Sequence, residues 1–123
     1  MPINFMDNLK AQLQSYYGWA DYEVDGLVRE YEKFLIIRSQ CDQCSPSDKI
    51  DNVWHQHILN TKHYYDYCLD KFNKIIHHDP QMADDQVARI GRLRNTCDKY
   101  YNQYGYPPPD HIWKLEELIG KIN

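Results

Sequence analysis

The chain of 123 residues carries 14 basic and 18 acidic side chains, which gives a formal net charge of -4. This length suits a single domain with one core, and the acidic balance argues against non-specific nucleic-acid binding, which needs clustered positive charge. Hydrophobic residues make up 42% of the chain and include 11 Tyr and 3 Trp, so we expect a globular domain whose core holds many hydroxyl groups that need hydrogen-bond partners.

Apolar residues at helical spacing predict two helices in the first third of the chain. From residue 3 to 17 they recur three or four positions apart, and Gly18 offers a C-terminal stop. A second helix is expected over residues 21–38, with one broad apolar face and Glu30 among the charged residues largely opposite it. Gly26 within this helix costs about 1 kcal/mol and would permit close packing.

The four cysteines are expected to be thiols or ligands rather than disulfides, because no signal-peptide pattern opens the chain. They are Cys41, Cys44, Cys68 and Cys97. Cys41 and Cys44 have a spacing that suits a zinc site or redox chemistry, but neither a second such pair nor a nearby helix start accompanies them. Two loop thiols are the simpler interpretation.

The rest of the chain also reads as helical. A third helix is expected to start at Ser45-Pro46, with Ser45 as its cap, and to run to residue 60. A fourth should span residues 61–73, a fifth residues 83–104, and a short last helix should begin near Asp110, after a proline-rich connector. No alternating polar and apolar run has the length of a strand, so we predict an all-α fold, a compact single-domain bundle of five to six helices over residues 1–123.

The segment from residue 45 to 80 holds five of the six histidines, and we predict that it forms a buried polar cluster that binds a metal. Helical geometry places Asp51 and His55 among apolar residues of the third helix rather than on its solvated side. They are one turn apart, so the Asp51 carboxylate could orient His55 and leave the second imidazole nitrogen for a metal or a substrate. The alternative is that the two side chains only bond each other.

The other candidate ligands are less well determined by their positions. His57 lies about 160° around the helix from His55, so the two side chains cannot easily coordinate one ion. The expected role of His57 is a hydrogen bond to a neighbouring helix. His63 is expected to be solvated, and Cys68 to lie on an apolar face. His77 and His78 precede Pro80, where a turn is expected; one of them can face His55, or both can bond helix carbonyl groups.

These considerations define a candidate site. The predicted metal ligands are His55, His57, Cys68, His77 and His78, and the candidate catalytic residues are Asp51 and Tyr64. Three His or Cys ligands with a carboxylate beside them would suit zinc, iron or copper. The histidine spacing matches no motif with a known mechanism, so the sequence does not specify a reaction.

Several short motifs resemble the conserved domain of plant glycine-rich domain-containing proteins. They are Tyr31-Glu32-Lys33-Phe34-Leu35, Trp54-His55-x-His57, His77-His78-x-Pro80 and Tyr104-Gly105-x-Pro107-Pro108. The resemblance spans about residues 27–113 and implies a helical domain in which the histidines, Asp51 and Cys68 are shared features. The plant proteins carry further glycine-rich and RNA-binding regions that have no counterpart in these residues, so the resemblance does not imply an RNA role.

The leading hypothesis is a small cytoplasmic helical domain that binds a transition metal and could act as an oxidoreductase-like enzyme. Its partner would be a small-molecule substrate or another protein. The alternative is a non-catalytic interaction module whose histidines form a structural core network. Neither a membrane partner nor a nucleic-acid partner is expected, because the chain has no long apolar run and because acidic residues dilute its basic cluster around Arg89–Lys99.

Overall fold

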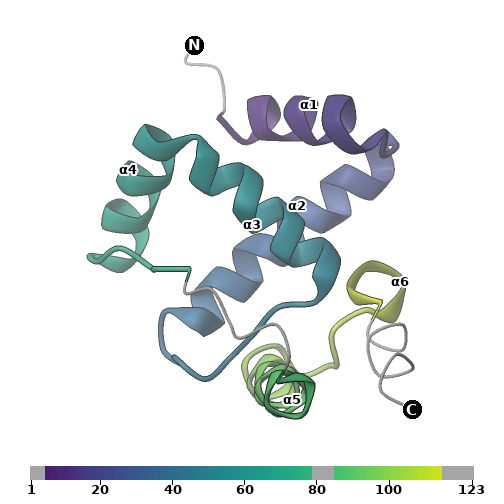
Figure 1. The fold of residues 1–123 in the computed structure, drawn as a ribbon, viewed down its shortest axis with the longest axis vertical. Helices are drawn as coiled ribbons and strands as arrows, with labels where there is room; N and C mark the ends of the chain where they lie inside the picture. Colours follow the sequence, from purple (N-terminus) through teal and green to yellow (C-terminus); the bar gives the residue numbers. More distant parts are fainter. Residues whose placement is uncertain (1–4, 79–84, 115–123) are drawn as a thin grey trace.

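The computed structural model describes residues 5–78 and 85–114, and these residues form helices without any strand. The helices are α1 (Phe5–Tyr17), α2 (Asp21–Arg38), α3 (Asp48–Leu59), α4 (Thr61–Phe72), α5 (Gln86–Tyr104) and α6 (Asp110–Trp113). The all-α prediction is therefore confirmed (Figure 1). The predicted beginnings of the first helix at residue 3 and of the fifth at residue 83 lie outside the described residues.

Helix α2 lies at the centre of the bundle, where it contacts α1, α3, α5 and α6 (Figure 1). Its apolar face is fully buried, as at Tyr31 and Phe34. A Cβ atom on Gly26 would lie 3.1 Å from Ile112 Cδ1, so α6 packs closely against α2 at this glycine, as predicted. None of the helices in the described residues is long and apolar enough to cross a membrane.

The start of α3 differs from the prediction. Its N-cap is Ser47, whose hydroxyl accepts from the Ile50 amide at 3.5 Å. Ser45, the predicted cap, instead bonds α5: its carbonyl accepts from the Thr96 hydroxyl at 2.7 Å, and its own hydroxyl accepts from Arg92 Nε at 3.1 Å. The predicted cap was wrong because both oxygen atoms of Ser45 are already hydrogen-bonded to α5, a helix far away in the sequence, so the cap lies two residues later, at Ser47.

Glu30 is buried, which contradicts its predicted place on the charged side of α2. Its carboxylate accepts hydrogen bonds from the Tyr100 hydroxyl at 2.6 Å and from Trp113 Nε1 at 2.9 Å, and it pairs with Lys33 at 3.2 Å. The tyrosine belongs to α5 and the tryptophan to α6. One carboxylate therefore joins α2 to the two helices that follow the histidine segment.

Cys41 and Cys44 form a disulfide, so the prediction that they are thiols or ligands was wrong. Their Cα atoms are 5.6 Å apart in the turn between α2 and α3, a separation that a disulfide can bridge. The turn is also held by α5, because the Asn95 side chain donates to the Gln43 carbonyl at 2.9 Å. Cys68 and Cys97 are free.

Candidate metal centre

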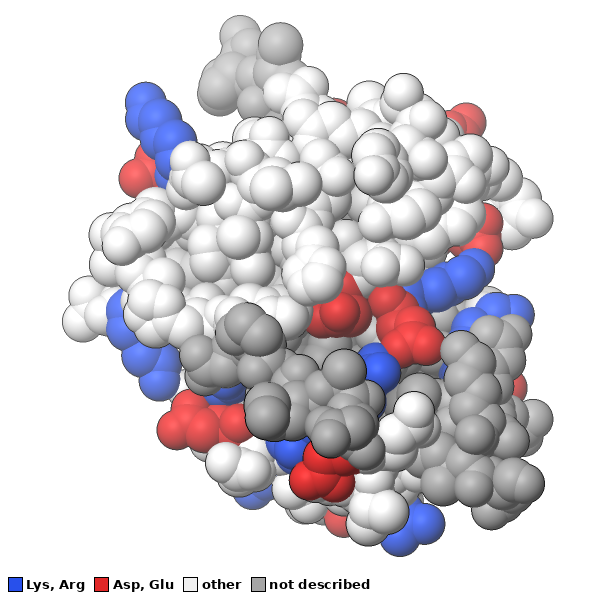
Figure 2. Space-filling view, viewed as in Figure 1, with Lys and Arg blue, Asp and Glu red and all other residues white. Residues whose placement is uncertain are grey.

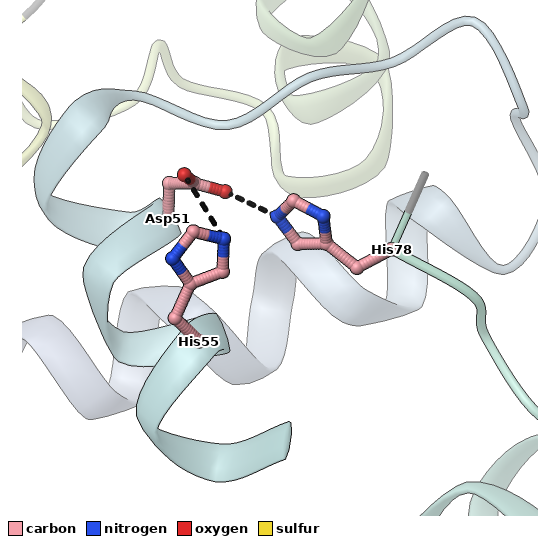
Figure 3. Close-up of side chains that lie close together, drawn as sticks. All are labelled: Asp51, His55 and His78. Atoms are coloured by element: carbon pink, nitrogen blue, oxygen red, sulfur yellow. Dashed lines mark hydrogen bonds and ion pairs between the residues drawn. The ribbon is translucent and has the colours of Figure 1, made fainter. Parts of the chain in front are cut away.

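Three side chains converge at the edge of α3. Asp51 and His55 lie one turn apart on this helix, and His78 comes from the segment that follows α4; both imidazoles face the Asp51 carboxylate (Figure 3). Asp51 Oδ1 is 2.7 Å from His78 Nε2, and Asp51 Oδ2 is 3.7 Å from His55 Nε2. All three potential ligand atoms lie within 4.8 Å of one another.

His78 is positioned by hydrogen bonds between α3, α4 and its own segment. The Tyr64 hydroxyl of α4 accepts from Trp54 Nε1 at 2.9 Å and donates to the Ile76 carbonyl at 2.5 Å. The Trp54 ring also contacts the His78 ring, with 4.3 Å between centroids. Tyr64, a predicted catalytic candidate, therefore supports the backbone two residues before His78, and its bond to Trp54 could not be predicted from the sequence.

The cluster is more accessible than the sequence suggested. The His55 side chain is 55% exposed, whereas those of Asp51 and His78 are 26% and 20% exposed. The expectation of a buried cluster was therefore wrong, and the short Asp51 bond is to His78 rather than to His55. The exposed edge of His55 makes the site open to solutes.

His57 belongs to a different cluster, in the interior. Its Nδ1 atom lies 2.5 Å from the Tyr31 hydroxyl of α2, and its Nε2 atom lies 2.8 Å from His63 Nδ1. It bonds a neighbouring helix, as its position on the helix predicted. His63 is half-buried and stacks on Phe5, so the prediction of a solvated His63 was wrong.

The remaining two candidates are also separated from the cluster. Cys68 is fully buried on α4, within the hydrophobic core. His77 is exposed and lines a cavity together with Arg38 and Lys74. The structure thus brings Asp51, His55 and His78 together and leaves His57, Cys68 and His77 elsewhere.

The buried His57 should make the stability of the protein depend on pH. Burial, reinforced by the neighbouring His63, lowers the pKa of His57 from 6.5 to about 3. The unfolded chain therefore binds the proton more readily, and folding stability is lost as the pH falls below 6.5. We expect this group to lower the free energy of unfolding by up to about 1.4 kcal/mol per pH unit between about pH 6 and 4.

The measurement is urea unfolding at several pH values in the presence of a chelator. The His57→Gln variant should show a shallower dependence of stability on pH than the unsubstituted protein. His111→Gln changes an exposed histidine on α6 and is the control, which should keep the original dependence. If His57→Gln leaves the dependence unchanged, the buried imidazole is not its source.

The distances in the surface cluster can be compared with those of a metal site. Zinc binds histidine nitrogen and carboxylate oxygen at about 2.0–2.2 Å, which places tetrahedral ligand atoms roughly 3.3 Å apart. The separation between His78 Nε2 and Asp51 Oδ1 is 2.7 Å and that between His55 Nε2 and Asp51 Oδ2 is 3.7 Å, one below and one above this value. Coordination of one ion would require side-chain rotations that draw all three ligand atoms, which lie within 4.8 Å of one another, to this spacing.

Comparison with known proteins identifies a family. The sequence model of the UCP032817-like family matches residues 2–95, which include Asp51, His55 and His78. No curated protein and no solved structure matches the chain. The resemblance to glycine-rich domain-containing proteins was therefore wrong; it relied in part on the Tyr104–Pro108 motif, which lies beyond the matched residues. The chain belongs to the UCP032817-like family.

Proposed function

We propose that this small helical protein binds a divalent transition metal, namely zinc, iron or copper, through Asp51, His55 and His78. The observation that carries the proposal is the convergence of two imidazole Nε2 atoms on one carboxylate, with all ligand atoms within 4.8 Å. Two of these residues come from α3 and the third from a segment more than twenty residues later. The convergence is thus a product of the fold.

The ligand set supports a reactive rather than a purely structural ion. Structural zinc sites are usually closed by four protein ligands, whereas catalytic sites leave a position for water or substrate. Two histidines and one carboxylate also form the ligand set of many iron-dependent oxygenases. With three protein ligands and an exposed His55, the proposed ion could accept a substrate, and the proposal includes a metal-dependent, oxidoreductase-like activity.

The surface charge does not favour a nucleic acid as the partner. On the face shown in Figure 2, lysine and arginine side chains are interspersed with aspartate and glutamate side chains. An extended nucleic acid would instead need a continuous basic surface. The substrate that we propose is a small molecule, because the exposed His55 side chain leaves the site open to solutes.

The proposal is tested by competition for metal with a chromophoric chelator, using protein without a metal-binding tag. We expect one equivalent of zinc or iron(II) to bind the unsubstituted protein, and Asp51→Asn, which keeps the side-chain shape, to bind at least about tenfold more weakly. Asp70→Asn alters an exposed carboxylate on α4 and is the matched control. Equal binding by Asp51→Asn would favour the alternative, in which the histidines form a structural network of an interaction module.

A further inference from the structure

A basic cavity adjoins the segment that carries His78. It has a volume of about 400 Å³, and its lining includes Arg38, Asp42, Lys74, His77 and Arg92. In the lower part of Figure 1, the end of α2, the segment after α4 and the start of α5 approach one another. This cavity is separate from the Asp51, His55 and His78 cluster, with which it shares none of its lining residues.

The cavity is positively charged, whereas the protein as a whole is negatively charged. Three cationic side chains and one carboxylate line it, whereas the chain as a whole carries -4. Arg38 ends α2, Lys74 follows α4 and Arg92 lies on α5, so folding gathers cations that are far apart in the sequence. Gathering like charges is unfavourable unless an anion offsets the repulsion.

The cations are held mainly by neutral acceptors. Lys74 donates to the Ser39 carbonyl at 2.6 Å, and Arg92 Nε donates to the Ser45 hydroxyl at 3.1 Å. Among the described residues, Asp42 is the carboxylate that pairs with these cations; it lies 3.1 Å from Arg38 but is 92% exposed, so water screens this pair. The positive charge of the cavity is therefore largely uncompensated by the residues that the structure describes.

Capping of α2 explains only part of this arrangement. Arg38 and Lys74 donate to carbonyls at and just beyond the end of α2, as basic side chains often do. Arg92 instead bonds the Ser45 side chain through Nε, and no other hydrogen bond of this guanidinium is found within the described residues. Its two terminal nitrogens are therefore available to a ligand as far as the described residues are concerned.

A disulfide and hydrogen bonds hold the walls of the cavity in place. The Cys41–Cys44 disulfide closes the turn that contributes Asp42 and Gln43, and α5 holds the Gln43 carbonyl through Asn95. On the other wall, Arg38 Nη2 donates to the His77 carbonyl at 3.5 Å. Such preorganisation lowers the ordering cost of binding a ligand.

We propose that this cavity binds the phosphate group of a small molecule. Guanidinium groups match phosphate oxygens with paired hydrogen bonds, and lysine adds a point charge. A volume of about 400 Å³ lies within the range of small-molecule sites and exceeds the needs of one phosphate ion. The ligand class is therefore a phosphate monoester, with inorganic phosphate as the simpler source of the same chemistry.

The test is calorimetric titration of chelator-treated protein with phenyl phosphate and, separately, with inorganic phosphate. We expect saturable binding that Arg92→Gln and Lys74→Gln each weaken about tenfold or more, since each removes a charge-assisted contact. Lys99→Gln removes an exposed charge from α5 outside the cavity and should bind as the unsubstituted protein does. Circular dichroism verifies that each variant is folded.

The outcomes separate the possible ligands and the two proposals. Tighter binding of phenyl phosphate supports an organic phosphate, and equal binding of both probes supports free phosphate. Absence of binding at millimolar concentrations, or binding that neither cavity substitution weakens, overturns the proposal. Asp51→Asn should bind phosphate normally, so failure of the metal proposal and failure of the phosphate proposal are distinguishable.

Discussion

Replacing His78 with glutamine is expected to weaken metal binding about 100-fold or more, with little change in the fold. Loss of groups that only orient a ligand commonly costs 10- to 100-fold in metal affinity, and loss of a ligand itself should cost at least as much. The His78 ring contributes one of the three converging ligand atoms. The measurement is competition for zinc or iron(II) with a chelator at fixed pH.

The neighbouring histidine provides a matched control. His77 lies one position earlier but lines the basic cavity instead of facing Asp51. His77→Gln should therefore retain the metal affinity of the unsubstituted protein, while His55→Gln should lose it as His78→Gln does. If His77→Gln and His78→Gln lost metal affinity equally, the conformation of the segment rather than the His78 imidazole would determine metal binding. That result would contradict the assigned ligand set.

Replacing Glu30 with alanine is expected to lower the free energy of unfolding by about 3–5 kcal/mol, which is typical when a buried ion pair loses one partner. The Glu30 carboxylate is the common acceptor for Tyr100 and Trp113 and the ionic partner of Lys33. Its removal would leave a buried hydroxyl, a buried indole N–H and a half-buried ammonium group without this partner. Urea unfolding at neutral pH measures the loss.

A nearby glutamate tests whether this effect is specific. Glu32 lies two positions later on α2 and is half-buried. Glu32→Ala should change the free energy of unfolding by less than about 1 kcal/mol, as substitutions away from buried networks usually do. If Glu30→Ala were as mild as Glu32→Ala, the bonds from Glu30 to α5 and α6 would not hold those helices to the bundle.

Local signals explain what could be predicted from the sequence. The bounds of α2 agree with the prediction, because its apolar spacing is unbroken over Asp21–Arg38. The predicted end of the fifth helix at residue 104 agrees with α5, whose C-cap Gly105 adopts the left-handed conformation. The proximity of Asp51 and His55 likewise follows from a separation of four residues on one helix, although the short hydrogen bond of Asp51 is to His78.

Contacts between distant segments explain what could not be predicted. Helical spacing placed Glu30 on a charged face, but α5 and α6 supply its partners and bury it. Nothing local distinguishes His77 from His78, because their directions depend on how Tyr64 and Trp54 hold the segment before them. The role of Ser45 and the disulfide between Cys41 and Cys44 likewise could not be predicted, because both belong to a turn that is hydrogen-bonded to α5.

The central claim is that Asp51, His55 and His78 hold one metal ion, and anomalous X-ray diffraction from a crystal grown with zinc tests it most directly. We expect one strong anomalous peak about 2.0–2.2 Å from Asp51 Oδ, His55 Nε2 and His78 Nε2. The peak should be absent from an Asp51→Asn crystal grown in the same way. A peak at other residues, or its absence at these three in metal-saturated crystals, would contradict the assignment.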